Sequence, residues 1–163
     1  GVFLVKPGGA VNLATKDLEK PNGILVSLGG KNVYVADNNN NPGGHHHLVE
    51  FTVRKDGTLG GKKVLFNFGP GRRGIDGMTL DVKGNIYATA GKGERAGIYV
   101  FSSTGKNLAF IKTPGSPTNC VFGGGKEKST LYITAQSAPR ADGTKPWGLF
   151  RIRLKIAGHH IFE

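Results

Sequence analysis

A short β-strand signature recurs three times along the chain, and this repeat constrains the fold more than any other feature. The tyrosines within the signature, Tyr34, Tyr87 and Tyr132, lie 53 and 45 residues apart. Each tyrosine stands in a run of strand-forming residues that follows a glycine-containing turn, and another short strand precedes that turn. A four-stranded repeat of about 40–50 residues is typical of one blade of a β-propeller.

The remaining sequence also favours short strands over helices. No window of a dozen residues keeps apolar residues at helical spacing without an interrupting Gly or Pro. Glycine supplies 27 of the 163 residues, and because Gly adopts positive φ at low cost, we expect many tight turns. The predicted strands are Val2–Val5, Ala10–Thr15, Ile24–Ser27, Val33–Asp37, Leu48–Val53, Lys63–Phe68, Met78–Asp81, Ile86–Ala90, Gly97–Ser102, Asn107–Lys112, Cys120–Phe122, Leu131–Thr134 and Gly148–Arg153.

These strands predict an all-β chain of about three and a half propeller blades in one segment, 1–163. The blade fragments fall at about 1–20, 21–68, 75–112 and 117–157. Known propellers close with about four to eight blades, which leaves few strand edges exposed. We therefore expect that N-terminal blades are absent and that the missing half comes from the same precursor, a second copy or a companion chain. The alternative is an ordinary β-sandwich whose hairpins are similar by coincidence.

Charge and composition limit the partners. Lys and Arg number 22 against 11 Asp and Glu, which gives a net charge of +11. The basic residues occur singly or in pairs, without the aromatic neighbours of an RNA-binding sheet, so we predict no specific nucleic-acid site and leave an acidic partner open. No apolar run approaches the ~18 residues of a membrane span. We expect a soluble protein whose targeting signal, if any, lies outside this chain. The single Cys120 excludes an internal disulfide and a multi-cysteine zinc site.

Three ordered motifs carry a family resemblance. The first two are Pro21-Asn22-Gly23-Ile24 with Tyr34–Asp37, and Ile75–Asp81 with Gly84–Tyr87; the third is Pro117–Gly124 with Leu131–Thr134. On these motifs the chain resembles the gluconolactonase family, which includes senescence marker protein and luciferin-regenerating enzyme. The resemblance implies a six-bladed propeller with a divalent metal, often calcium, in its channel. It also implies hydrolysis of sugar lactones or related esters.

The resemblance implies roles for two residues. Asn22 and Asp76 match the family's asparagine and aspartate metal ligands, whereas its glutamate ligand has no match, because that blade would lie before Gly1. Each of the two precedes a Gly at the start of an expected innermost strand, where its side chain would face the channel. Oxygen ligands suit Ca²⁺, with Zn²⁺ or Mg²⁺ as alternatives. A bound cation would polarise a lactone carbonyl and lower the pKa of a bound water, and Asp76 is also a candidate general base. An Asx turn is the structural alternative for Asp76.

Other polar residues are weaker candidates. We expect Asn119 to occupy the equivalent position in the third unit, as either a substrate contact or a turn residue. Arg72 and Arg73 precede the Asp76 strand; Arg73 is a candidate contact for an anionic substrate, and a solvated loop is the alternative. His45-His46-His47 invites a metal-site interpretation, but neighbouring residues of an extended chain point to opposite faces, so we do not expect one there.

Two functions of different classes follow. The first is a divalent-metal-dependent lactonase-like hydrolase, which we expect to be inactive as this chain alone. The second is a non-catalytic propeller-derived binding or assembly module whose basic surface engages an acidic partner. Replacing Asp76 by Ala discriminates between them, because it should abolish hydrolysis under the first and leave partner binding intact under the second.

Overall fold

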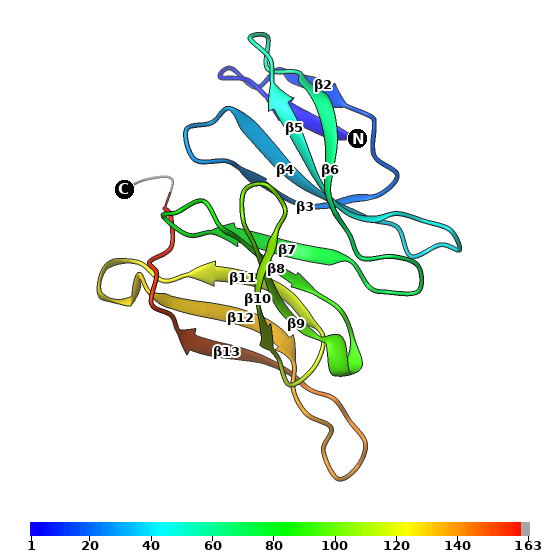
Figure 1. Ribbon diagram of the computed structural model, residues 1–163, viewed down its shortest axis with the longest axis vertical. Coiled ribbons are helices and arrows are strands. Elements are labelled where there is room, and N and C mark those ends of the chain that lie inside the picture. Colours follow the sequence, from blue (N-terminus) through cyan, green and yellow to red (C-terminus); the bar gives the residue numbers. More distant parts are fainter. Residues whose placement is uncertain (161–163) are drawn as a thin grey trace.

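The structure is a computed structural model that describes residues 1–160, and strands dominate this part of the chain (Figure 1). Two 3₁₀ helices of three residues each, η1 (Gly93–Arg95) and η2 (Gly125–Glu127), accompany them. The strands are β1 (Val2–Val5), β2 (Val11–Thr15), β3 (Pro21–Val26), β4 (Asn32–Asn38), β5 (His46–Val53), β6 (Leu59–Asn67), β7 (Ile75–Leu80), β8 (Ile86–Ala90), β9 (Gly97–Phe101), β10 (Asn107–Lys112), β11 (Pro117–Phe122), β12 (Thr130–Gln136) and β13 (Trp147–Arg153).

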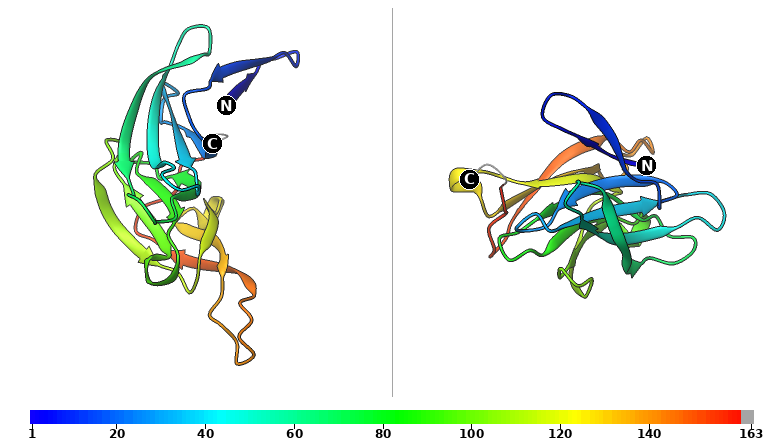
Figure 2. Two further views of the ribbon diagram at one scale, coloured as in Figure 1. Left: turned by 90° about the vertical axis from the view of Figure 1, so that its right-hand side faces the viewer. Right: turned by 90° about the horizontal axis from the view of Figure 1, so that it is seen from above.

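The strands form separate antiparallel sheets, each made of strands that are consecutive in sequence. Two sheets have four strands, in the orders β3-β4-β5-β6 and β7-β8-β9-β10. A third sheet has the order β11-β12-β13, and β1 pairs with β2 as a hairpin. The sheets follow one another along an arc (Figure 2). The all-β prediction is confirmed, and the two four-stranded sheets have the meandering pattern of propeller blades.

Apolar layers between neighbouring sheets hold this arc together. Leu48, Ile75, Ile86 and Phe101 belong to the layer between the two four-stranded sheets and are almost fully buried. A second layer joins the β7–β10 sheet to the β11–β13 sheet, and a third joins the β1–β2 hairpin to the β3–β6 sheet. Every residue of β8 is buried, which is typical of a strand that is covered on both faces. The stacking brings the first strands of the three sheets, β3, β7 and β11, next to one another (Figure 1).

The structure contains no helix, within residues 1–160, that has the length and apolar character needed to cross a bilayer.

Candidate functional site

The first strands of the three sheets line an open hollow of about 580 Å³. Its walls carry one carboxylate and no Lys, Arg or His side chain among the described residues. The lining comes entirely from β3, β7 and β11: Asn22, Gly23, Ile24, Asp76, Gly77, Met78, Thr118 and Asn119. The structure thus places three sequence-predicted site residues, Asn22, Asp76 and Asn119, in one cavity.

Each of these three strands begins with a β-bulge that aims a polar side chain at the hollow. In β7, Ile75 pairs with Ala90 and Met78 with Ala88, so Asp76 and Gly77 together oppose Thr89 alone. The same two-against-one pattern occurs at the start of β3 and of β11. A bulge of this kind redirects a side chain, and such bulges are common beside active sites.

The bulge register corrects one expectation from the sequence. Pro21, Ile75 and Pro117 occupy the same position in the three strands. Counting from them, the residue that corresponds to Asn22 and Asp76 is Thr118, and Asn119 stands where the other two strands have glycine. The expected equivalence of Asn119 was therefore wrong by one position, because the motif in β11 lacks the glycine that marks the bulge. Both Thr118 and Asn119 nevertheless line the hollow.

The glycines of the bulges allow neighbouring strands to approach closely. A Cβ added to Gly23 would overlap the main-chain carbonyl of Asp76. A Cβ on Gly77 would lie 2.9 Å from the Cα of Asn119 and overlap its side-chain amide. The Asn-Gly and Asp-Gly pairs of the sequence thus combine a polar side chain that faces the hollow with a residue small enough to pack against the next strand.

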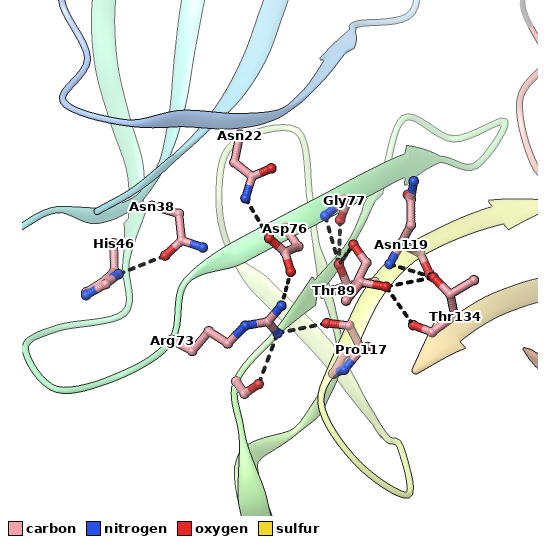
Figure 3. Close-up of polar contacts among 12 residues, drawn as sticks. Asn22, Asn38, His46, Arg73, Asp76, Gly77, Thr89, Pro117, Asn119 and Thr134 are labelled. Carbon is pink, nitrogen blue, oxygen red and sulfur yellow. Dashed lines mark hydrogen bonds and ion pairs between the residues drawn. The ribbon is translucent and has the colours of Figure 1, made fainter. Parts of the chain in front are cut away.

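Asp76 lies at the centre of a polar chain that crosses the strands (Figure 3). Asn22 Nδ2 donates to Asp76 Oδ1 at 2.5 Å, and the Arg73 guanidinium forms an ion pair with Asp76 Oδ2. Arg73 Nη1 also donates to the carbonyls of Pro117, at 2.8 Å, and Gly91, at 3.3 Å. Burial lowers the pKa of the Arg73 guanidinium, and the Asp76 carboxylate compensates its charge. Arg73 thus fixes the orientation of Asp76 and ties β7 to β11.

Two threonines support the bulges from behind, and sequence reasoning missed them. Thr89 Oγ1 accepts from Gly77 N at 2.9 Å and contacts the carbonyls of Gly77 and Thr118 at 3.0 and 3.1 Å. Thr134 Oγ1 accepts from Asn119 N at 3.1 Å in the next sheet. The available signal was a threonine two residues after the strand tyrosine in the second and third repeats, at the position that Ala36 occupies in the first.

The side chains that could act as metal ligands suit a hard cation, although there are few of them. Asn22 and Asp76 supply an amide oxygen and a carboxylate, both of which Ca²⁺ and Mg²⁺ accept as ligands. In the present orientation the Asn22 amide nitrogen faces Asp76, and a rotation of the amide would present its oxygen instead. No group of three or more His, Cys, Asp or Glu side chains that could hold a metal occurs within residues 1–160. A cation held here would therefore need further ligands from water or from groups other than these.

Cys120 and the three consecutive histidines lie outside this hollow. Burial raises the pKa of the Cys120 thiol to about 12, so this residue is a small core side chain and not a nucleophile. The histidines alternate in direction as expected: the rings of His45 and His47 stack with centroids 4.5 Å apart, whereas His46 is buried and contacts Asn38 Oδ1 at 3.0 Å (Figure 3).

Comparison with known proteins agrees with this architecture. A family model described as "SMP-30/Gluconolactonase/LRE-like region" matches residues 1–137. A gluconolactonase from Zymomonas mobilis is 31% identical over 156 residues, which cover 91% of this chain. The solved structure of a luciferin-regenerating enzyme superposes on 96% of this chain with a TM-score of 0.76 at 22% identity. A calcium-binding regucalcin from Agrobacterium tumefaciens superposes on 93% with a TM-score of 0.70 at 23% identity.

The chain spans only part of each of these relatives. It covers 41% of the Zymomonas gluconolactonase, 52% of the luciferin-regenerating enzyme and 51% of the regucalcin. Its sheets correspond to about half of a six-bladed propeller, so the predicted fold class is confirmed. The strand repeat, the order of the sheets and the match over residues 1–137 together show that the chain belongs to the SMP-30/gluconolactonase/LRE-like family.

Proposed function

We propose that the chain forms part of a divalent-metal-dependent hydrolase that opens sugar lactones or related esters. The observation that carries this proposal is the convergence of Asn22 and Asp76 in the hollow between β3, β7 and β11. Two relatives support the same chemistry, since one is named a gluconolactonase and another a calcium-binding protein. Ca²⁺ is the proposed cation, with Zn²⁺ or Mg²⁺ as alternatives.

In this proposal Asn22 and Asp76 hold the cation through their side-chain oxygens. When bound, the cation would polarise the lactone carbonyl and lower the pKa of a water molecule. Asp76 would also accept the proton of the attacking water as general base. Arg73 keeps one carboxylate oxygen of Asp76 paired, so the other is the oxygen that faces Asn22 and the hollow.

Substrate contacts are proposed for Asn119 and Arg73. Asn119 lines the hollow, although its side-chain oxygen accepts from Cys120 N at 2.9 Å, which leaves its amide nitrogen as the donor to a substrate. The terminal nitrogens of Arg73 already contact Asp76, Pro117 and Gly91, so its proposed substrate contact must use its remaining N–H groups. Orienting Asp76 is the role that its contacts support better.

The test uses the protein purified from its source, together with whatever completes the ring. Light scattering gives its native mass, and a pH-stat measures lactone opening with and without EDTA. We expect a mass well above the 17.2 kDa of the chain and hydrolysis that is lost with EDTA and restored by Ca²⁺. Substitution of Asp76 by Ala should abolish this activity. Full activity in that variant, or hydrolysis indifferent to EDTA, contradicts the proposal.

A further inference from the structure

A second hollow lies beside the candidate metal site. Its lining carries cationic side chains, whereas the only charged side chain lining the candidate metal site, among the described residues, is the Asp76 carboxylate. The volume of the second hollow is about 610 Å³, within the range of small-molecule sites. It is lined by the connections β4–β5, β6–β7 and β8–β9, with the adjoining ends of β5 and β6. These segments belong to the two complete four-stranded sheets. The hollow therefore forms entirely from described residues of this chain.

The lining of this second hollow is basic. Arg72, Arg73 and Lys92 contribute three cationic side chains, the stacked rings of His45 and His47 add to its wall, and none of its lining residues is Asp or Glu. Arg72 and Lys92 are exposed, and neither forms an ion pair with a described residue. Burial lowers the pKa of His47. Because Asp76 compensates the charge of Arg73, the positive charge of this hollow comes mainly from Arg72 and Lys92.

Hydrogen bonds within and between the connections shape the hollow in advance. In the β4–β5 connection, Asn39 N donates to His45 O at 2.8 Å. Gly91 N donates to Arg73 O at 3.1 Å, which ties the β8–β9 connection to the β6–β7 connection. A Cβ on Gly74 would lie 3.0 Å from Asn38 Oδ1, so these segments pack against each other closely. A preformed cationic site binds an anion with a smaller loss of conformational entropy than a flexible loop.

Arg73 connects the two hollows. Its side chain lines the basic one, and its guanidinium pairs with Asp76 in the wall of the other. The two hollows are therefore adjacent at Arg73, and Arg72 and Lys92 lie in the wall of the basic one.

From this juxtaposition we propose that the basic hollow is a subsite for an anionic group, a phosphate or a carboxylate, carried by the substrate at a distance from its lactone or ester. The assignment to a substrate rests on the proposed function. Binding of the anion itself depends only on Arg72, Lys92 and their neighbours. Guanidinium and ammonium groups bind oxyanions by charge-assisted hydrogen bonds, and Arg does so in bidentate fashion.

The first experiment titrates inorganic phosphate into the chain by calorimetry at constant ionic strength. The test variant carries Arg72→Ala and Lys92→Ala, and the matched control carries Lys126→Ala and Lys128→Ala. The control removes the same charge at the exposed β11–β12 turn, which belongs to the third sheet and does not line the basic hollow. We expect saturable binding that weakens about tenfold or more in the test variant and changes little in the control. Equal losses of phosphate affinity in both variants, or no saturable phosphate binding by the unaltered chain, overturn the proposed subsite. Thermal unfolding of both variants verifies that they fold.

The second experiment uses the protein purified from its source and compares three lactones of one sugar: neutral, phosphorylated and carboxylated at the far carbon. We expect a lower KM for one anionic lactone than for the neutral one, and the favoured anion distinguishes phosphate from carboxylate. EDTA-sensitive hydrolysis with equal KM values for all three overturns the substrate assignment and leaves the proposed function standing. Phosphate binding that depends on Arg72 and Lys92, without hydrolysis of any lactone, contradicts the proposed function instead.

Discussion

Asn22 Nδ2 and Asp76 Oδ1 lie 2.5 Å apart, although 54 residues separate them in the chain. Each is the second residue of the first strand of its sheet, so this contact joins two blades at the edge of the hollow. Arg73 extends the contact through Asp76 to the carbonyl of Pro117 in the third sheet. A single carboxylate therefore links all three blades, and its removal should affect stability as well as any chemistry.

The ion pair between Arg73 and Asp76 should show strong coupling. Because both side chains are largely buried, loss of the Asp76 carboxylate leaves the guanidinium without its counter-charge. We expect Asp76→Ala to lower the free energy of unfolding by about 1–3 kcal/mol. A double-mutant cycle with Arg73→Met should give a coupling energy of about 1 kcal/mol or more. Urea unfolding gives the free energy of unfolding of all four proteins in the cycle. Strictly additive effects of the two substitutions would contradict the ion pair.

Gly77 should resist replacement even by alanine. A Cβ at this position collides with Asn119, and overpacking of this kind costs about 1–3 kcal/mol. Gly124→Ala is the matched control, since Gly124 has an ordinary φ of −97° and no atom within 4 Å of an added Cβ. We expect Gly77→Ala to lower the urea midpoint clearly and Gly124→Ala to leave it almost unchanged. Similar midpoints for the two variants would show that β7 and β11 do not pack as described.

Thr89→Val should destabilise the bulge that positions Asp76. The substitution keeps the side-chain shape but removes the hydroxyl that contacts Gly77 N, Gly77 O and Thr118 O. Leaving buried main-chain groups unsatisfied costs about 1–3 kcal/mol. Thr52→Val, at an exposed position of β5, is the control and should stay within about 0.5 kcal/mol of the unaltered chain. If Thr89→Val unfolds at the same urea concentration as the control, the hydroxyl has no such role.

Much of the fold could be predicted because its signals are local. The strand tyrosines Tyr34, Tyr87 and Tyr132 all lie on the second strand of their sheets, and the glycine turns between strands depend on short-range backbone geometry. The repeat period then placed Asn22 and Asp76 at the start of neighbouring first strands, where the structure brings them into contact.

The remaining features of the site depend on pairing between distant segments. The bulge register shifts the third motif by one residue, so Thr118 and not Asn119 corresponds to Asp76. No local pattern reveals that Arg73 pairs with the carboxylate three residues later and also reaches the carbonyl of Pro117. The basic hollow likewise combines three connections from two sheets, which only the packing of those sheets brings together.

Tyr87 should give the chain a distinct alkaline response. Burial, followed by the nearby Asp81 carboxylate, raises the pKa of the Tyr87 phenol from 10.0 to about 12. Between these two values the unfolded chain releases the proton while the folded chain retains it, so ionisation favours unfolding. The stability that Tyr87 provides is therefore complete below pH 10 and declines as the pH rises towards 12.

The Tyr87→Phe variant lacks this pH dependence, although it also loses the hydrogen bond to Asp81 Oδ2. We expect the unaltered chain to be the more stable at pH 8, with a smaller difference in unfolding free energy at pH 11. Urea unfolding at both pH values measures this difference, and a constant difference would contradict the raised pKa.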